Sequence, residues 1–257
     1  MGSEMCIRDR DNTAAPVICK PIEHGATIVV HSLTKFIGGH GTTIGGIIVD
    51  SGKFDWAKDP KRQPMLNNPD PSYHGMIWTE FAKAVGPIAY IVRARFVGLR
   101  DLGPALSPQS AFQIIQGLET VSLRMEKHCS NAEKVAEYLS GHNKVSKVIY
   151  AGLDEGEAGE RANKYLKGGH GALCGFELKG GKASGEKFIN NLNMFYHVAN
   201  IGDARSLAIH PATTTHSQLS DEDMESAGVN PSYVRLSIGI EHIDDIIEDL
   251  KNALDTA

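Results

Sequence analysis

The 257-residue chain has few cysteines and no long apolar stretch, and each absence excludes a class of protein. Its four cysteines, Cys6, Cys19, Cys129 and Cys174, form no CxxC pair and stand at no zinc-finger spacing from histidine. This pattern favours reduced, mostly buried thiols over a disulfide framework or a zinc site. No apolar run is long enough to cross a bilayer or to form the core of a signal peptide. We therefore expect a cytoplasmic protein that does not bind membranes.

The chain also lacks any run of like charges. It carries 26 Lys and Arg against 31 Asp and Glu, a net charge of −5, and both signs are scattered. A nucleic-acid-binding protein needs a basic stripe, so we expect no nucleic-acid partner. There is no internal repeat, and the hydrophobic fraction of 41% is that of an ordinary globular protein.

The first ten residues, MGSEMCIRDR, have neither helical nor strand periodicity. They resemble the translation of a sequencing-library adapter, and we set them aside as an artefactual leader. The natural protein is then expected to be longer at this end. We expect residues 11–140 to be the C-terminal part of a large domain with a long connecting helix, and residues 141–257 to be a small α/β domain.

Two short β-branched runs, residues 26–30 and 44–49, predict buried strands on either side of the Gly-rich loop HSLTKFIGGHGTT. A Pro- and Asn-rich surface segment follows over residues 51–77, and then a helical stretch over 78–100. Ser107 and Pro108 predict the start of a very long helix or a kinked pair of helices, with Gly141 at its end. Its periodic apolar positions are Phe112, Ile115, Leu118, Met125, Ala132, Val135 and Leu139.

The second half of the chain alternates strand and helix patterns. Strands are predicted at residues 145–150 and 172–178, and a helix over 188–192. The run VRLSIGIE alternates apolar and polar residues from Val234 to Glu241, which is typical of a strand. A final amphipathic helix is predicted over residues 243–254.

Lys35 lies between a predicted buried strand and a Gly-rich turn, preceded by the hydroxyl residues Ser32 and Thr34. A lysine that forms a Schiff base needs a cleft, an easily lost proton and a nearby anion site, which hydroxyls and free backbone N–H groups supply. Taken alone the pattern is weak, because most lysines beside such loops are solvated surface residues. A P-loop is disfavoured, since GxxxxGK[ST] is absent and this lysine precedes the glycines.

Several strings in the right order change this assessment. Asp11-Asn12-Thr13, HGATIVVHSLTK and GGHGTTIGGIIVD together resemble the Cys/Met-metabolism family of pyridoxal-phosphate (PLP) enzymes. The resemblance implies the α/β, aspartate-aminotransferase-like fold called fold type I. It also implies that Lys35 holds PLP covalently, that Ser32 and Thr34 help to bind its phosphate, and that Asp11 pairs with its ring nitrogen. Without the other strings, Asp11 would be read as a turn residue.

Arg235 interrupts the strand VRLSIGIE on its polar face. The plain alternative is an exposed arginine on an edge strand. A guanidinium is also the group best suited to clamp a carboxylate with two hydrogen bonds. In the resembled family the arginine of R-L-S-x-G-x-E binds the substrate α-carboxylate, and this arginine corresponds to Arg235. A family serine next to the same carboxylate corresponds to Ser206.

The string GDARSL, residues 202–207, resembles the O-acetylhomoserine sulfhydrylase branch of that family. Cystathionine enzymes more often carry a glutamate where Arg205 stands. A cation there is expected to disfavour a second amino group on the substrate. Three histidines, His197, His210 and His216, lie close in sequence, but their spacing matches no zinc signature, so we expect packing or hydrogen-bonding roles and no metal.

The resemblance implies γ-replacement on O-acetyl-L-homoserine with sulfide or methanethiol, giving homocysteine or methionine plus acetate. The freed Lys35 amine would act as general base. A cystathionine γ-synthase or γ-lyase, and a catalytically dead fragment, remain open alternatives, as does a succinyl ester. The family is usually a homotetramer built from active dimers. Its ring-stacking aromatic, its Gly-containing phosphate loop and a Tyr and Arg from a neighbouring subunit are not found in this chain, so we expect impaired activity.

Overall fold

The computed structural model describes residues 9–257, and their contacts divide into two compact units. Unit 1 comprises residues 9–12, 20–32 and 45–112. Unit 2 comprises residues 13–19, 33–44 and 113–257. The expected boundary at residues 140/141 falls inside unit 2, because the long helix before it packs in the same hydrophobic core as the C-terminal sheet. Within the described part of the chain, no helix combines the length and apolar character that spanning a membrane requires.

A three-stranded sheet forms the first part of unit 1. Strand β1 (Asp9–Asp11) runs parallel to β2 (Ile28–Ser32), which is antiparallel to β3 (Gly46–Asp50). Strand β1 starts inside the segment that we set aside as a leader; residues 1–8 of that segment lie outside the described residues. Both predicted strands are confirmed with shifted bounds.

The prediction that the second of these strands is buried is wrong. Ile47 and Ile48 of β3 are 43% and 46% exposed. Among the described residues, β3 is an edge strand of its sheet, so no further strand pairs with it. A β-branched apolar run predicts a strand, but it does not tell which elements cover that strand.

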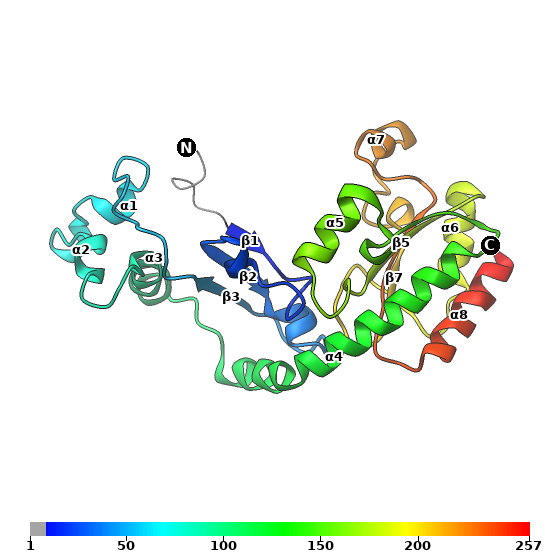
Figure 1. The fold of residues 1–257 in the computed structure, drawn as a ribbon, viewed down its shortest axis with the longest axis horizontal. Helices are drawn as coiled ribbons and strands as arrows, with labels where there is room; N and C mark the ends of the chain where they lie inside the picture. Colours follow the sequence, from blue (N-terminus) through cyan, green and yellow to red (C-terminus); the bar gives the residue numbers. More distant parts are fainter. Residues whose placement is uncertain (1–8) are drawn as a thin grey trace. The chain divides into compact units, whose positions relative to one another are not determined.

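The rest of unit 1 is a group of short helices that follow β3 and precede the long helix in sequence; Figure 1 labels α1, α2 and α3. They are α1 (Pro64–Asn67), α2 (Trp78–Ala82), α3 (Ala89–Arg93) and a wide helical segment over Ala94–Asp101. The predicted helix over 78–100 is therefore interrupted between Ala82 and Ala89, where Gly86 and Pro87 stand. An aromatic cluster that includes Trp56 and Trp78 forms the core of this group.

Helix α4 (Pro108–Ser140) is one continuous helix of 33 residues and not a kinked pair. The Ser107 hydroxyl accepts a hydrogen bond from Ser110 N at 3.0 Å, which confirms the predicted N-cap. Of its predicted apolar face, the C-terminal members are buried: Met125, Ala132, Val135 and Leu139. The N-terminal members are 52–54% exposed: Phe112, Ile115 and Leu118.

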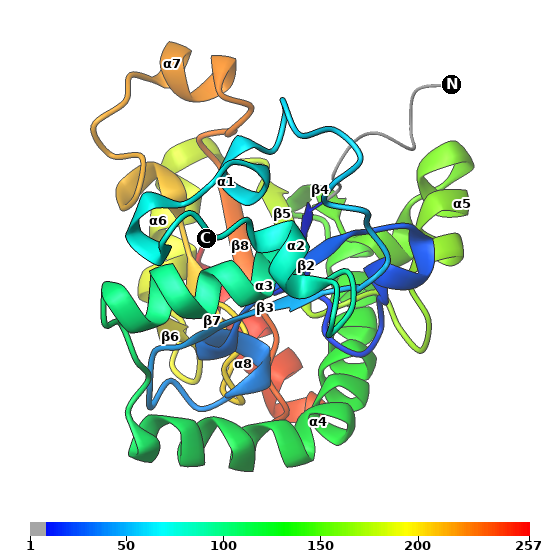
Figure 2. The ribbon, with the colours of Figure 1, turned by 90° about the vertical axis from the view of Figure 1, so that its left-hand side faces the viewer.

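Unit 2 is built on a mixed five-stranded sheet in the order β4-β5-β8-β7-β6, which Figure 2 shows. Its strands are β4 (Val145–Ile149), β5 (Leu173–Leu178), β6 (Tyr196–His197), β7 (Leu207–Ile209) and β8 (Tyr233–Ser237). The helices of this unit besides α4 are α5 (Gly156–Tyr165), α6 (Gly181–Asn190), α7 (Asp221–Ser226) and α8 (Ile243–Thr256).

The core of unit 2 joins this sheet to α4, α6 and α8. Val234 and Leu236 of β8 are fully buried, as the alternating pattern predicts, although the strand ends at Ser237. Two segments from the N-terminal half enter the same core, carrying Ile18, Phe36 and Ile37. The second of these segments also carries Lys35.

Candidate functional site

Residues Leu33–Ile37 follow strand β2 as a single wide helical turn. Lys35 breaks it with a non-helical backbone (φ −91°, ψ −131°). Phe36 and Ile37 are buried in the core of unit 2 and anchor the turn there. Two backbone hydrogen bonds close it: Gly38 N donates to Leu33 O at 2.9 Å, and Gly39 N donates to Lys35 O at 2.7 Å. The half-buried Lys35 side chain therefore starts from a fixed backbone.

The Lys35 ammonium and the Arg235 guanidinium meet on one residue, Asn200. Lys35 Nζ donates a short hydrogen bond to Asn200 Oδ1. Arg235 Nη2 donates to the backbone oxygen of Asn200 at 3.1 Å. The structure thus brings together two of the predicted site residues, which are 200 positions apart in sequence, within unit 2.

Arg235 lies on an interior strand, which excludes the alternative of an exposed edge-strand arginine. Strand β8 pairs with β5 on one side and β7 on the other, and Arg235 stands opposite Gly175 and Ile209. Gly175 leaves room for the Tyr233 ring, because a Cβ at position 175 would lie 2.5 Å from that ring. The arginine is half-buried on the face opposite the fully buried Val234 and Leu236.

Among the described side chains, neither cation is paired with a carboxylate: the ion pairs found there involve other residues. Asn200 gives both of them neutral oxygen acceptors. A guanidinium without an anionic partner is available to bind an incoming carboxylate.

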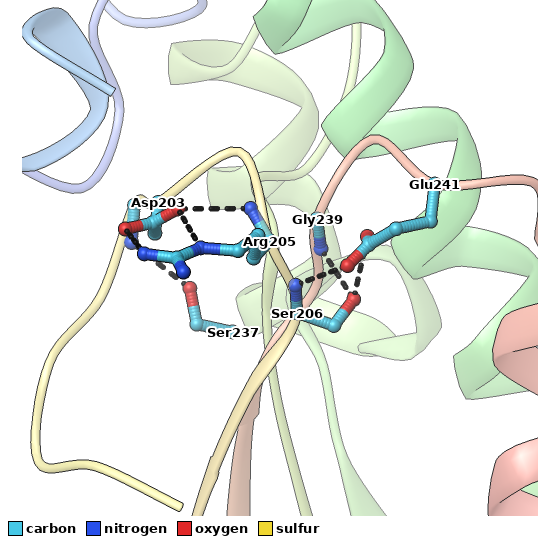
Figure 3. A network of polar contacts seen from close by, with 7 residues as sticks. Asp203, Arg205, Ser206, Ser237, Gly239 and Glu241 are labelled. Carbon is cyan, nitrogen blue, oxygen red and sulfur yellow. Dashed lines mark hydrogen bonds and ion pairs between the residues drawn. The ribbon is translucent and has the colours of Figure 1, made fainter. Parts of the chain in front are cut away.

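Ser206 belongs to the frame of this region, which Figure 3 shows. It is fully buried, and its hydroxyl donates to Glu241 Oε2 at 2.9 Å and accepts from Gly239 N at 2.9 Å. Glu241 Oε1 also accepts from Ser206 N at 2.6 Å. Gly239 must lack a side chain, because a Cβ would lie 2.5 Å from Ala204 O. In this arrangement the Ser206 hydroxyl hydrogen is donated to Glu241, and the expected contact of Ser206 with a substrate carboxylate stays a prediction.

The charge of Arg205 is balanced within the chain, also visible in Figure 3. Its guanidinium lies 3.3 Å from the buried carboxylate of Asp203 and stacks on the Tyr196 ring, 4.4 Å from the centroid. The hydrogen bond that Arg205 donates to Asp203 raises the pKa of Arg205. The expectation that this cation disfavours a second amino group on the substrate stays a prediction.

Asp11 and Ser32 belong to unit 1, and the other four predicted site residues belong to unit 2. Asp11 ends strand β1 and stands beside Val30 of β2, while Ser32 ends β2 opposite Gly46. Burial lowers the pKa of His31 in the same sheet, and the Asp11 carboxylate opposes part of this effect. Thr34 is in the Lys35 turn, in unit 2.

Two of the three clustered histidines form side-chain hydrogen bonds. His210 is fully buried and doubly hydrogen-bonded, to Thr213 Oγ1 at 2.9 Å and to Pro231 O at 2.8 Å, which confirms a hydrogen-bonding role. His216 contacts the neighbouring Thr215 hydroxyl at 2.9 Å. Among the side chains that the structure describes, no three of His, Cys, Asp or Glu are grouped so as to hold a metal ion.

Asn200 is the site residue that sequence reasoning missed. It stands two residues before the string GDARSL, in which Arg205 and Ser206 are the residues singled out from the sequence. An asparagine in a loop is usually a turn residue, and nothing in its spacing relates it to Lys35. Only the folded loop shows that its amide and its backbone oxygen meet two cations.

Residues 5–255 match the family model described as Cys/Met metabolism PLP-dependent enzyme. The O-acetyl-L-homoserine sulfhydrylase of Leptospira meyeri is 54% identical over 251 residues, covering 95% of this chain and 56% of that protein. The homocysteine synthase of Schizosaccharomyces pombe is 51% identical over 249 residues, covering 96% and 57%. The chain therefore spans little more than half the length of these curated relatives.

A solved structure has a similar fold. It is that of a putative O-acetylhomoserine (thiol)-lyase from Campylobacter jejuni, described as containing a pyridoxyl-lysine monophosphate. It is 40% identical, with a TM-score of 0.87, and the match covers 97% of this chain and 59% of that one. This likeness confirms the expected α/β fold of the PLP-dependent transferases, fold type I.

Proposed function

Because the chain belongs to the Cys/Met metabolism family of PLP-dependent enzymes, we propose that it carries the PLP-attaching lysine, Lys35, and the carboxylate-binding arginine, Arg235, of a γ-replacement enzyme. The observation that carries the proposal is the convergence of both side chains on Asn200. A site for an amino-acid derivative needs an amine for the cofactor aldehyde and a cation for the α-carboxylate, held close together.

The residues present fit PLP. The Lys35 amine is bonded to a neutral amide, not neutralised by an acid, so it is suited to attack an aldehyde after losing one proton. Thr34 lies in the same turn and supplies a hydroxyl for a phosphate. Asp11 and Ser32 are proposed for the ring nitrogen and the phosphate on the strength of the family motif alone. Ser206 is assigned to the frame that holds residues 204–206 against Gly239 and Glu241.

When bound, PLP supplies an electron sink for negative charge at the substrate α-carbon. The chain's own residues do the rest. Arg235 holds the α-carboxylate with its planar fork of donors, which fixes the direction of the α C–H bond. Lys35 Nζ would accept the α-proton, then take a proton from the β-carbon as acetate leaves the γ-carbon, and return a proton to the β-carbon after the thiol has added to the γ-carbon. Asn200 holds the free amine beside the arginine before the cofactor is attached.

We propose O-acetyl-L-homoserine as the amino-acid substrate and sulfide or methanethiol as the acceptor, with homocysteine or methionine and acetate as products. The relatives in Leptospira meyeri and Schizosaccharomyces pombe support this choice by their names. We further propose a cytoplasmic homo-oligomer, a tetramer as in the resembled family. Cysteine as the preferred acceptor would indicate a cystathionine γ-synthase, and release of a keto acid would indicate a γ-lyase.

The direct test is reductive labelling. The chain is incubated with PLP, reduced with borohydride, digested, and its peptides are mapped by mass spectrometry. We expect the pyridoxyl label on Lys35 and its absence in Lys35→Arg. Lys53, an exposed lysine of unit 1, serves as the control for non-specific labelling. Equal labelling of Lys35 and Lys53 would overturn the proposal. Turnover with sulfide, methanethiol and cysteine then distinguishes the reaction classes, and labelling without turnover would identify a cofactor-binding but inactive chain.

A further inference from the structure

Arg124, on helix α4, is a buried cation that faces the Lys35 turn. It is 5% exposed, and its Nη1 donates to Phe36 O at 2.6 Å while Nη2 donates to Ile37 O at 2.9 Å. These are the two carbonyls that directly follow Lys35. No carboxylate among residues 9–257 forms an ion pair with this guanidinium.

The guanidinium is itself held in place along its own helix. Its Nε donates to Thr120 Oγ1 at 3.1 Å, and Nη2 also donates to Gly117 O at 2.7 Å. The side chain therefore lies back along two turns of α4, toward the N-terminal end of that helix. Its position is fixed by the same element that forms the core of unit 2.

Two glycines allow this close approach. A Cβ at Gly117 would overlap the backbone oxygen of Gly38, and a Cβ at Gly39 would overlap the Arg124 guanidinium. Gly39 also has a positive φ of 73°, which side chains other than glycine rarely adopt. The Lys35 turn thus fits into a notch of α4 that any side chain at either position would fill.

A neutral apolar residue would fill the same volume, so packing alone does not account for an arginine here. Burying a guanidinium costs free energy that only several well-placed acceptors offset. Carbonyls at the end of a short turn lack partners within the turn, and the planar fork of arginine matches two of them at once. Arg124 donates to the carbonyls of two consecutive residues, and a side chain that only filled the space would not do this.

We propose that Arg124 is a positioning residue for the cofactor-attaching lysine, because it fixes the two peptide units after Lys35 and so keeps Nζ directed to Asn200. This inference rests on the proposed function of Lys35. The chain contains no contact between Arg124 and Lys35 Nζ itself, so Arg124 acts through the backbone of the turn.

The test uses the full 257-residue chain and a readout that does not need the cofactor. Amide hydrogen exchange at Gly38 and Gly39 reports the two hydrogen bonds that close the turn. In Arg124→Met we expect these amides to exchange about tenfold faster, the effect of losing roughly one net hydrogen bond. Thr120→Val removes the acceptor for Arg124 Nε and the hydroxyl that donates to Gly117 O, and leaves the two bonds from Arg124 to the turn. We expect a smaller acceleration at the same two amides.

Val135→Ala is the matched control, because Val135 is fully buried on the same helix and away from the turn. It should lower global stability without a selective change at Gly38 and Gly39. The second readout is the rate at which Lys35 reacts with PLP, followed by reductive labelling. It should fall about tenfold in Arg124→Met, and it should not fall in Val135→Ala.

The outcomes separate the two proposals. Unchanged exchange at Gly38 and Gly39 in both Arg124→Met and Thr120→Val would overturn the inference, whatever the chain does with PLP. Failure of the parent chain to label at Lys35 would instead overturn the proposed function. If Arg124→Met does not fold, Thr120→Val decides: selective acceleration at the two glycine amides supports the role of Arg124, and its absence refutes it.

Discussion

A single uncharged residue accepts hydrogen bonds from both cations of the site. Asn200 accepts from Lys35 with its amide oxygen and from Arg235 with its backbone oxygen. In Asn200→Asp a carboxylate replaces the amide beside Lys35. We expect the pH midpoint for PLP attachment to rise by about one to three units, because a nearby anion favours the protonated amine.

Asn200→Ala is the companion variant, since it removes the amide oxygen without adding charge. The pH midpoint for PLP attachment in this variant should stay within about half a unit of the parent's, while the rate of PLP attachment to Lys35 falls. The measurement is the rate of reductive labelling of Lys35 at a series of pH values. Identical midpoints in the aspartate variant and the parent would show that the Asn200 side chain does not set the environment of the lysine.

His128 makes the stability of the chain depend on pH. It is fully buried, and burial lowers its pKa from 6.5 to about 4. Between these values the unfolded chain binds a proton that the folded chain does not. The contribution of neutral, buried His128 to the free energy of unfolding is therefore fully present above pH 6.5. It is lost as the pH drops toward 4, a decrease of about 3 kcal/mol.

His128→Asn tests this dependence. His128 Nδ1 lies 2.6 Å from Ile238 O and donates to it, and an asparagine amide keeps a donor there. Urea denaturation at several pH values between 7 and 4.5 should give a shallower fall in the free energy of unfolding for the variant. His31 and His210 also have lowered pKa values, so the difference between variant and parent is the quantity to compare. Parallel curves would contradict the assignment.

The sequence predicted the charged residues proposed for the site and missed the residues that hold them in place. Lys35 and Arg235 stand in recognisable strings, because a Schiff-base lysine and a carboxylate-binding arginine need particular neighbours. Asn200 accepts a hydrogen bond from Lys35, 165 positions away, and Arg124 donates to Phe36 and Ile37, 88 and 87 positions away. No local pattern records such pairs. The motif that suggests Ser206 does not tell which way its hydroxyl points, and in the structure this hydroxyl donates to Glu241.

Helix α8 is joined to the loop after α6 by one carboxylate. Asp249 is 7% exposed and accepts backbone N–H groups from residues 193–195, at 2.9, 2.9 and 3.4 Å. In Asp249→Asn one acceptor oxygen becomes a donor facing other donors. We expect the free energy of unfolding to fall by about 1–3 kcal/mol, because charged hydrogen bonds are lost and an amide N–H is left unpaired.

Glu248→Gln, the neighbouring exposed position on the same helix, is the control and should change stability by about 0.5 kcal/mol or less. Urea denaturation followed by circular dichroism measures both variants. Equal stability of Asp249→Asn and the parent would show that the three backbone contacts contribute nothing net.

At the scale of elements, hydrophobic periodicity predicted most of the strands and helices, but it did not always predict which of their faces are buried. The pattern at Val234 and Leu236 gave the correct buried face of β8 because that face meets helices of the same unit. The same kind of reasoning failed for Ile47 and for Phe112, which are 43% and 54% exposed. Hydrophobic spacing tells which residues share a face, and only the tertiary arrangement decides whether that face is covered.

The chain passes repeatedly between its two units, so neither is a continuous segment. Residues 13–19 and 33–44 precede most of unit 1 in sequence, yet they belong to unit 2. Ile18, Phe36 and Ile37 bury their side chains in its core, and Lys167 N donates to Ile18 O at 2.8 Å. The lysine turn is therefore held by residues that come more than a hundred positions later.

This interleaving predicts how the cut chain behaves. Residues 102–107 are exposed and lack regular structure, so a specific protease site inserted between Pro104 and Ala105 should be cleaved without unfolding the protein. The two fragments should then elute together in size-exclusion chromatography under native conditions and separate in denaturant. They remain joined because the N-terminal fragment contributes Ile18 and Phe36 to the core that the C-terminal fragment completes. If the fragments separated in native buffer, residues 13–19 and 33–44 would not be stably packed in unit 2. The packing proposed to fix the Lys35 turn would then be contradicted.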